Sequence, residues 1–432
     1  MEKITFEQLD ETLYYEKLDN GLDVYILPKK GFSKTFVTFT TKYGSIDRTF
    51  VPIGEEEMIT VPDGIAHFLE HKMFEKEDGD VFQKFSELGA SANAFTSFTR
   101  TAYLFSGTNH IYDSTKTLLD FVQQPYFTEE TVNKEKGIIG QEITMYDDQP
   151  DWRQYFGTIE NMYHNHPVKI DIAGTIETID GITAEHLYTC YNTFYHPSNM
   201  LLFVIGAVEP EEMMDFIRND QASKEFQEPT PLNRHFDEEP THVAVKERTL
   251  HMDVQKPKVM PGLKAKTVHL QGADMLKHEL AMNIGFELLF GRTSPFYTRV
   301  YEADLIDESF GQDFSLEEGF GFGLIGSDTS EPARLIEEIQ QELKAAESAL
   351  PFTAEDVERM KRKKIGFYLR AMNSIEFIAN SFTRYKFNDM NLFDAVPTLE
   401  QLTFDDIQEA LTSIQGQDQQ TIFTVLPMEQ HA

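Results

Sequence analysis

DGIAHFLEHKMF, at residues 63–74, contains two histidines and a glutamate in the order His-x-x-Glu-His. Each residue of an α-helix turns about 100° around the axis, so His67 and His71 lie within about 40° of each other and Glu70 about 60° from His67. The apolar residues of the stretch gather on the opposite side. The pattern therefore predicts a helix that buries one face in a core and presents two imidazoles and a carboxylate on the other.

This polar face suits a zinc ion. Two neutral imidazoles on one helix can bind a single Zn²⁺ at ~2.0–2.1 Å, and a catalytic site keeps one position open for water. Zinc lowers the pKa of that water to ~7, so that Glu70 can accept its proton as a general base. The residue order is that of the inverted zincin signature. The alternative is a solvated helix face that carries this combination by chance.

A third ligand is expected in NKEKGIIGQEITMY, at residues 133–146. Glu135 and Glu142 are two helical turns apart and share one face. One of them can bind zinc, while the other holds the second ring nitrogen of a histidine. Taken alone, this segment is more typical of an ordinary charged helix face.

With these two segments the chain resembles the pitrilysin/insulinase family of zinc metallopeptidases, which includes bacterial and mitochondrial processing peptidases. The resemblance covers nearly the whole chain and is strongest over residues 15–205. It implies one Zn²⁺ per chain, bound by His67, His71 and Glu142. It also implies that Glu70 is the catalytic base and that Glu135 supports it as a second carboxylate of the catalytic group.

The segment LGASANAFTS, at residues 88–97, matches the family's edge strand beside the metal. We expect one strand over about 93–106, and the resemblance implies that an extended peptide adds to its edge. Asn93, Ala94 and Phe95 would then bind substrate. A glycine turn followed by an ordinary covered strand is the alternative.

The second half departs from the family pattern of an Arg and a Tyr seven residues apart. Tyr301 and Glu308 align with those positions, and Arg299 lies two residues early. Arg299 and Tyr301 remain candidate substrate-binding residues. The departure implies a dimer, either of identical chains or with a related subunit that supplies the Arg/Tyr pair, and this chain resembles the zinc-bearing partner.

The order of predicted elements repeats along the 432 residues. We expect a zinc-binding α+β domain over 1–220, a Pro- and acid-rich linker over 221–245, and a second α+β domain without the zinc motif over 246–432. Each half should contain a mostly antiparallel sheet with helices on one face. By the resemblance, the two similar halves form a clamshell around a substrate chamber.

Composition excludes several classes of protein. The 72 acidic residues outnumber the 38 Lys and Arg, giving a net charge of −34, which disfavours binding to nucleic acid or to an acidic membrane. One cysteine excludes a disulfide framework. No long apolar stretch predicts a membrane span, and the first residues do not resemble a secretory signal, so we expect a cytoplasmic protein.

These features favour a zinc metalloendopeptidase that hydrolyses peptides or unfolded polypeptide segments. The alternative is a non-catalytic assembly subunit of a heteromeric complex that resembles the processing peptidases.

Overall fold

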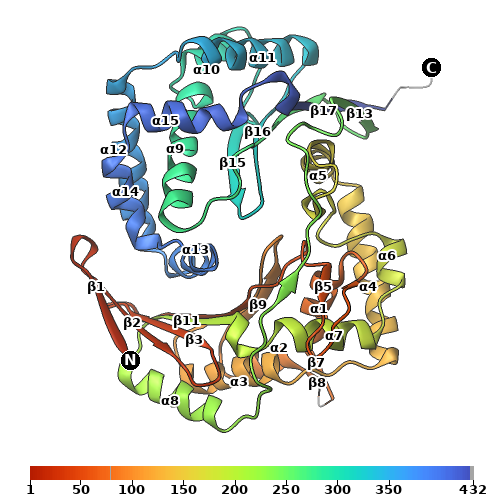
Figure 1. Cartoon of the computed structure of the whole chain (residues 1–432), viewed down its shortest axis with the longest axis vertical. Helices are drawn as coiled ribbons and strands as arrows, with labels where there is room; N and C mark the ends of the chain where they lie inside the picture. Colours follow the sequence, from red (N-terminus) through yellow and green to blue (C-terminus); the bar gives the residue numbers. More distant parts are fainter. Residues whose placement is uncertain (78, 429–432) are drawn as a thin grey trace. The chain divides into compact units, whose positions relative to one another are not determined.

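The computed structural model describes residues 1–77 and 79–428, which form two compact units. Unit 1 comprises Met1–Ile143, Ile170–Phe236 and Ala371–Phe387. Unit 2 comprises Thr144–Lys169, Asp237–Arg370 and the chain from Asn388 onward. Each unit combines one large sheet with several helices (Figure 1), which confirms the predicted α+β class with two halves.

Unit 1 is built on a seven-stranded sheet. In spatial order its strands are β1 (Glu2–Phe6), β2 (Glu11–Lys17), β3 (Asp23–Pro28), β11 (Met200–Gly206), β4 (Thr35–Thr41), β10 (Thr101–Gly107) and β9 (Ser91–Thr96). All neighbouring pairs are antiparallel except β3 and β11, which are parallel. The strand β9 therefore ends the sheet.

Short strands accompany this sheet. They are β5 (Thr49–Val51) and β6 (Ile59–Thr60), which pair with β12 (Asn233–Arg234), and the pair β7 (Glu75–Lys76) and β8 (Gly79–Asp80). The helices of unit 1 are α1 (Ile65–Met73), α2 (Val81–Glu87), α3 (Ile111–Gln123), α4 (Glu129–Asp147, whose last turn belongs to unit 2), α6 (Ile176–Asp180), α7 (Ala184–Phe194), α8 (Pro210–Ala222) and α13 (Ile375–Phe387).

The central strands of unit 1 are buried on both faces. Every residue of β4 and β11 is buried. Side chains such as Val37 and Phe39 join the core formed with α1, α3 and α7. On the other face, the ring of Phe203 lies 4.7 Å from that of Phe382 on α13. The main helical layer thus covers one face, as predicted, and a helix from a distant part of the chain covers the other.

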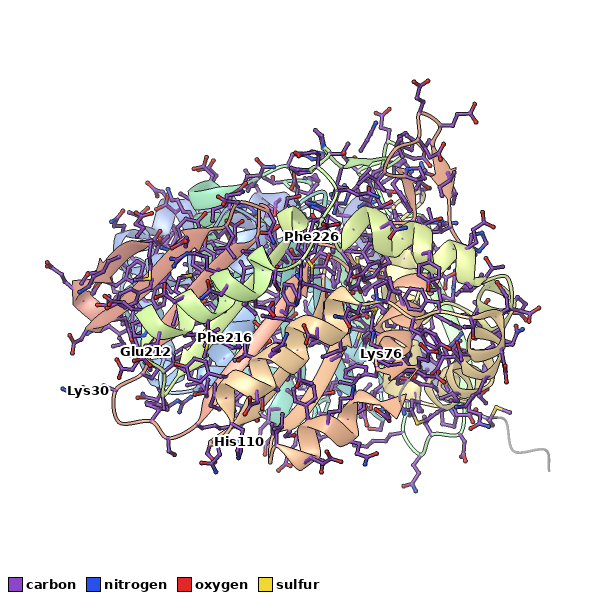
Figure 2. All side chains as sticks on the ribbon, turned by 90° about the horizontal axis from the view of Figure 1, so that it is seen from below. Lys30, Lys76, His110, Glu212, Phe216 and Phe226 are labelled. Carbon is purple, nitrogen blue, oxygen red and sulfur yellow. The ribbon has the colours of Figure 1, made fainter. Side chains whose placement is uncertain are left out.

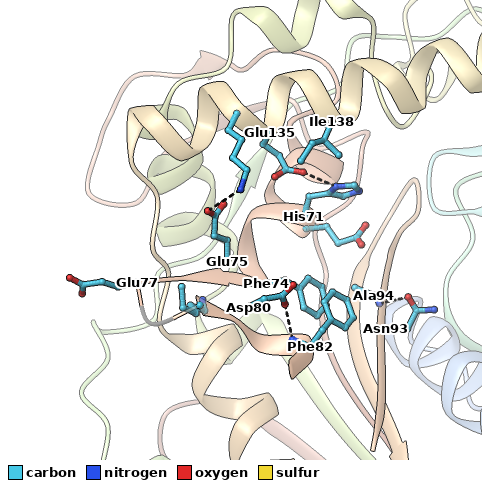
Figure 3. Close-up of a pocket in the computed structure, with 14 residues that line it drawn as sticks. His71, Phe74, Glu75, Glu77, Asp80, Phe82, Asn93, Ala94, Glu135 and Ile138 are labelled. Atoms are coloured by element: carbon cyan, nitrogen blue, oxygen red, sulfur yellow. Dashed lines mark hydrogen bonds and ion pairs between the residues drawn. The ribbon is translucent and has the colours of Figure 1, made fainter. Parts of the chain in front are cut away.

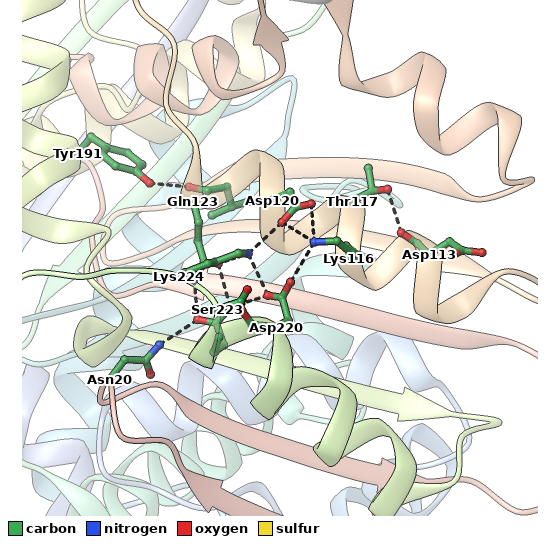
Figure 4. Close-up of polar contacts among 12 residues, drawn as sticks. Asn20, Asp113, Lys116, Thr117, Asp120, Gln123, Tyr191, Asp220, Ser223 and Lys224 are labelled. Carbon is green, nitrogen blue, oxygen red and sulfur yellow. Dashed lines mark hydrogen bonds and ion pairs between the residues drawn. The ribbon is translucent and has the colours of Figure 1, made fainter.

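A polar network joins α3 to the end of α8. Lys116 pairs with Asp220 at 3.2 Å and Asp120 with Lys224 at 3.0 Å, and further ion pairs form inside each segment (Figure 4). Nearby, Tyr112 packs against Phe216, and Figure 2 shows Phe216 and Glu212 on α8 next to α3, which starts after His110. The first residues of the predicted linker are therefore held against unit 1.

The middle of the predicted linker is also ordered. The β12 strand pairs with β5, and Arg234 Nε donates to the buried Asp47 carboxylate at 2.7 Å. The boundary between the units falls after Phe236. The linker predicted over 221–245 is therefore corrected, because its first part is bound to unit 1 by a strand pair and a charge-assisted hydrogen bond.

Unit 2 repeats the strand arrangement of unit 1. In spatial order its strands are β13 (Glu247–Met252), β17 (Gln420–Pro427), β14 (Lys258–Lys264), β16 (Phe320–Asp328) and β15 (Gly311–Glu317). Numbered along the chain, both this sheet and the β3-to-β9 part of unit 1 follow the order 1-5-2-4-3, with one parallel pair at the 1-5 position. The shared order supports a duplication.

The helices of unit 2 are α5 (Pro150–Met162), α9 (Gly272–Phe290), α10 (Pro295–Glu302), α11 (Pro332–Ser348), α12 (Ala354–Ala371), α14 (Ala395–Gln401) and α15 (Phe404–Leu411). Helices α9 and α15 pack together, and α9 also contacts β15. In the described part of the chain, no helix combines the length and apolar character needed to cross a membrane.

The two halves exchange one helix each. In both, it is the third helix after the fourth strand of the shared order. Helix α5, from the first half of the sequence, packs on β14 and β17 of unit 2, while α13, from the second half, packs on β4 and β11 of unit 1. This corrects the predicted continuous domains 1–220 and 246–432, since each sheet gains a cover from the other half of the sequence.

A buried histidine in unit 2 predicts acid sensitivity. Burial lowers the pKa of His166 to about 4, and its Nδ1 accepts a hydrogen bond from the Val168 N–H. The unfolded chain, with a histidine pKa of about 6.5, binds this proton first as the pH falls. His166 should therefore stabilise the fold above pH 6.5 and cost about 3 kcal/mol of unfolding free energy by pH 4.

Urea unfolding between pH 7 and 4 measures this effect. His166→Asn retains a hydrogen-bond acceptor without titrating, so its unfolding free energy should fall less steeply with pH than that of the wild type. His110→Asn is the matched control, because His110 is exposed and already has a positive φ that Asn tolerates. Equal slopes for all three proteins would contradict the assignment.

Candidate metal centre

Helix α1 begins at a position that requires glycine. Gly64 has φ 86°, and a Cβ there would lie 2.4 Å from the Ala173 carbonyl oxygen. The neighbouring Asp63 pairs with Arg48 at 3.1 Å. From this start the helix buries Phe68, Leu69 and Met73, in agreement with the predicted apolar face.

Three side chains of unit 1 converge beside α1. His67 Nε2 lies 3.8 Å and His71 Nε2 3.5 Å from different oxygens of Glu142, which projects from α4. One ligand atom from each of the three residues falls within 4.8 Å of the others. Two ligands that are each ~2.1 Å from a tetrahedral zinc ion lie ~3.4 Å apart. The nitrogen and carboxylate donors therefore fit a divalent ion such as zinc.

Glu135 lies behind His71. Along α4, Glu135 lies two turns away from Glu142. Glu135 Oε1 is 3.1 Å from His71 Nδ1 (Figure 3). A proton on Nδ1 shared with this carboxylate leaves Nε2 as the lone-pair donor. Of the two glutamates, the structure thus places Glu142 among the ligand atoms and Glu135 against a histidine. Glu135 therefore contacts a candidate ligand and is not part of the converging group itself.

The electrostatics differ between the two histidines. Burial lowers the pKa of His67, and the neighbouring His71 lowers it further, so His67 is neutral at pH 7. Burial also acts to lower the pKa of His71, but the hydrogen bond to Glu135 and the nearby carboxylates raise it above its ordinary value. A charged His71 carries a second proton on Nε2, and a cation bound at Nε2 would take the place of that second proton.

Glu70 is a second buried carboxylate of the group, beside Glu135. It is 8% exposed, and burial raises its pKa. The Thr96 hydroxyl at the end of β9 donates to Glu70 Oε2 at 2.8 Å and partly offsets that effect. A carboxylate with a raised pKa beside a metal site is chemically suited to exchange protons.

A cavity of about 620 Å³ opens beside Glu70 and His71. The backbone of β9 borders it through Asn93 and Ala94, and the stacked rings of Phe74 and Phe82, 4.2 Å apart, form an apolar wall (Figure 3). The Ala94 N–H is bonded to the Asn93 side chain at 2.9 Å. This amide therefore faces the edge of the sheet rather than β10.

The single strand expected over 93–106 is two strands. β9 and β10 form a hairpin, closed by Ser97 and Arg100, whose backbone groups bond at 2.8 Å. Phe95 lies under Arg100, with 5.6 Å from the guanidinium to the ring centroid. The hairpin makes β9 the edge strand that the resemblance implies, next to the candidate ligands.

Arg299 and Tyr301 belong to unit 2, not to this cluster. Arg299 pairs with Glu338 at 3.0 Å and with Glu342 at 2.9 Å, both on α11. Tyr301 is 55% exposed and stacks on Tyr297. Within unit 2, Arg299 therefore fastens α10 to α11, and its role in substrate binding stays a prediction.

Three residues near the site were not predicted from the sequence. Thr96 binds Glu70, Phe82 lines the cavity, and the fully buried Lys72 forms an ion pair with Glu75. Thr96 stands inside the quoted edge segment, so its side chain could have been considered there. Lys72 offered no comparable signal, because a lysine on a helix is usually exposed.

Comparison with known proteins agrees with this geometry. Residues 56–176 match the family profile described as Insulinase (Peptidase family M16), and residues 181–364 match the one described as Peptidase M16 inactive domain. The protein called "Uncharacterized zinc protease YmfH" from Bacillus subtilis is 58% identical over 424 residues, which cover 98% of this chain and 99% of the relative. The chain belongs to peptidase family M16, the insulinase family.

Two solved structures share the fold. A putative M16-like peptidase from Alicyclobacillus acidocaldarius is 39% identical, with a TM-score of 0.93 over 97% of this chain and 99% of that one. A protease from Helicobacter pylori is 19% identical, with a TM-score of 0.81 over 96% and 99%. At that lower identity the likeness concerns the fold alone.

Proposed function

We propose that this M16 protein is a zinc-dependent endopeptidase that hydrolyses peptides or unfolded polypeptide segments. The observation that carries the proposal is the convergence of His67, His71 and Glu142, with Glu70 buried next to them. The relatives named zinc proteases support the choice of metal. An extended substrate suits the exposed edge of β9, because a strand edge binds peptides through main-chain hydrogen bonds.

His67, His71 and Glu142 would hold the ion, with Glu135 fixing the tautomer of His71. Bound zinc supplies a Lewis acid that polarises the scissile carbonyl and acidifies water. Glu70 accepts the proton of the attacking water and passes it to the leaving amine. The Ala94 amide, released from Asn93, is available to the peptide backbone.

We also propose that the active form is a dimer. Unit 2 has Tyr301 and Glu308 at the positions of the family's Arg and Tyr, and Arg299 is engaged in an ion pair with Glu338. A second copy of the chain or a related subunit would therefore supply the Arg/Tyr pair. The cytoplasm is the proposed location. The alternative of a non-catalytic assembly subunit is disfavoured by the intact set of candidate ligands.

Metal analysis and a peptide assay test the proposal together. The untagged protein should contain one zinc per chain, and a quenched fluorescent peptide should be cleaved in the presence of the partner chain. Dialysis against a chelator should abolish cleavage, and added Zn²⁺ should restore it. A protein that binds no zinc, or binds it and cleaves nothing with any partner, would refute the proposal.

A further inference from the structure

The end of the edge strand contacts the buried carboxylate of the site. Thr96 Oγ1 donates to Glu70 Oε2 at 2.8 Å, and Glu70 is buried at 8% exposure. A buried carboxylate oxygen needs such a donor, since leaving it unpaired is costly. The Thr96 hydroxyl thus donates to Glu70 rather than to one of the three candidate ligands.

The backbone of Thr96 is fixed on several sides. It pairs with Thr101 of β10, and the next residue, Ser97, closes the hairpin on the Arg100 carbonyl through both its N–H and its hydroxyl. The Ser97 carbonyl accepts from the Ser45 N–H at 3.0 Å, and Thr101 donates to the Tyr43 carbonyl. The loop at 43–45 thus holds the hairpin end in place.

The side chain of Thr96 is restricted as well. A β-branched residue in a strand has limited freedom about χ1, so its hydroxyl keeps one direction. With Oε2 held by Thr96, rotation of the Glu70 carboxylate is restrained and its other oxygen, Oε1, keeps a defined direction. The same strand that would bind the peptide therefore orients the proton acceptor.

We propose that Thr96 is a positioning residue that aims the Glu70 carboxylate for proton transfer. The inference rests on the proposed function, which it deepens. Strand β9 would then hold both the peptide substrate that pairs with its edge and the side chain of the base, Glu70.

Three variants test the inference. Thr96→Val keeps the shape and removes the donor, and it should lower kcat about tenfold or more while KM and zinc affinity stay near the wild-type values. Thr96→Ser restores the donor and should restore most of kcat. Thr12→Val is the matched control, because Thr12 is a strand threonine of the same sheet, five strands from β9.

A second measurement does not depend on turnover. In the metal-free protein, Thr96→Val should lower the urea midpoint of unfolding when Glu70 is present and leave it unchanged in the Glu70→Ala background. Equal shifts in both backgrounds would overturn the contact. Full kcat in Thr96→Val would overturn the positioning role, whereas a wild type that cleaves nothing with any partner would instead remove the proposed function.

Discussion

Glu70→Gln is expected to bind zinc normally and to lose nearly all peptide hydrolysis. The amide keeps the size of the carboxylate and can still accept the hydrogen bond from Thr96, but it cannot take a proton from water. General acid–base catalysis contributes ~10²–10⁴-fold, so kcat should fall by about a thousandfold. Zinc content is measured on the same sample that is assayed with the fluorescent peptide.

The matched control is Glu87→Gln, at an exposed position on α2 outside the cavity. It should retain both zinc and full activity. If Glu70→Gln kept more than about a tenth of the wild-type kcat, Glu70 could not be the base. Loss of zinc in that variant would point instead to a damaged site.

Glu142→Ala is expected to lose zinc. It removes the only carboxylate among the ligand atoms that converge in the described part of the chain, and the two histidines that remain form an incomplete site. A chelator-competition assay should show a fall in zinc affinity of more than about hundredfold, since even an outer partner such as Glu135 is worth ~10–100-fold. Glu135→Gln should therefore weaken binding less than Glu142→Ala.

Thermal unfolding gives an independent reading of the same variant. Zinc at a thousand times its Kd adds about 4 kcal/mol of stability to the wild type. A hundredfold loss of affinity leaves the same zinc concentration at about ten times Kd, so this gain should fall to about 1.4 kcal/mol or less in Glu142→Ala. Glu130→Ala, an exposed change in the first turn of the same helix, should keep the full gain. A preserved zinc-induced shift in Glu142→Ala would exclude this residue as a ligand.

The sequence predicted both the α+β class and the candidate ligands that the structure brings together. Helical periodicity placed His67, Glu70 and His71 on one face, and the seven-residue spacing placed Glu135 and Glu142 on another, because both relations are local and follow from 3.6 residues per turn. Which of the two glutamates joins the histidines as a candidate ligand depends on how α4 lies against α1. Only the resemblance to the family indicated that this residue is Glu142.

Features that depend on distant contacts were missed. The hairpin turn at 97–100 contains neither Gly nor Pro, so nothing marked a break in the strand expected over 93–106. The hydrogen bond from Thr96 to Glu70 joins a strand to a helix. The boundary at 220 followed local composition, whereas the actual division depends on where α5 and α13 pack.

The exchanged helices α5 and α13 constrain how this chain can evolve and be engineered. An ancestral gene duplication normally leaves two copies that recombination can separate, replace or shuffle. Here a crossover near residue 236 would separate each sheet from the helix that covers one of its faces. Each product would also retain a helix, α5 or α13, without the sheet on which it packs. Chimaeras with other M16 proteins should therefore transfer both halves as one inseparable cassette.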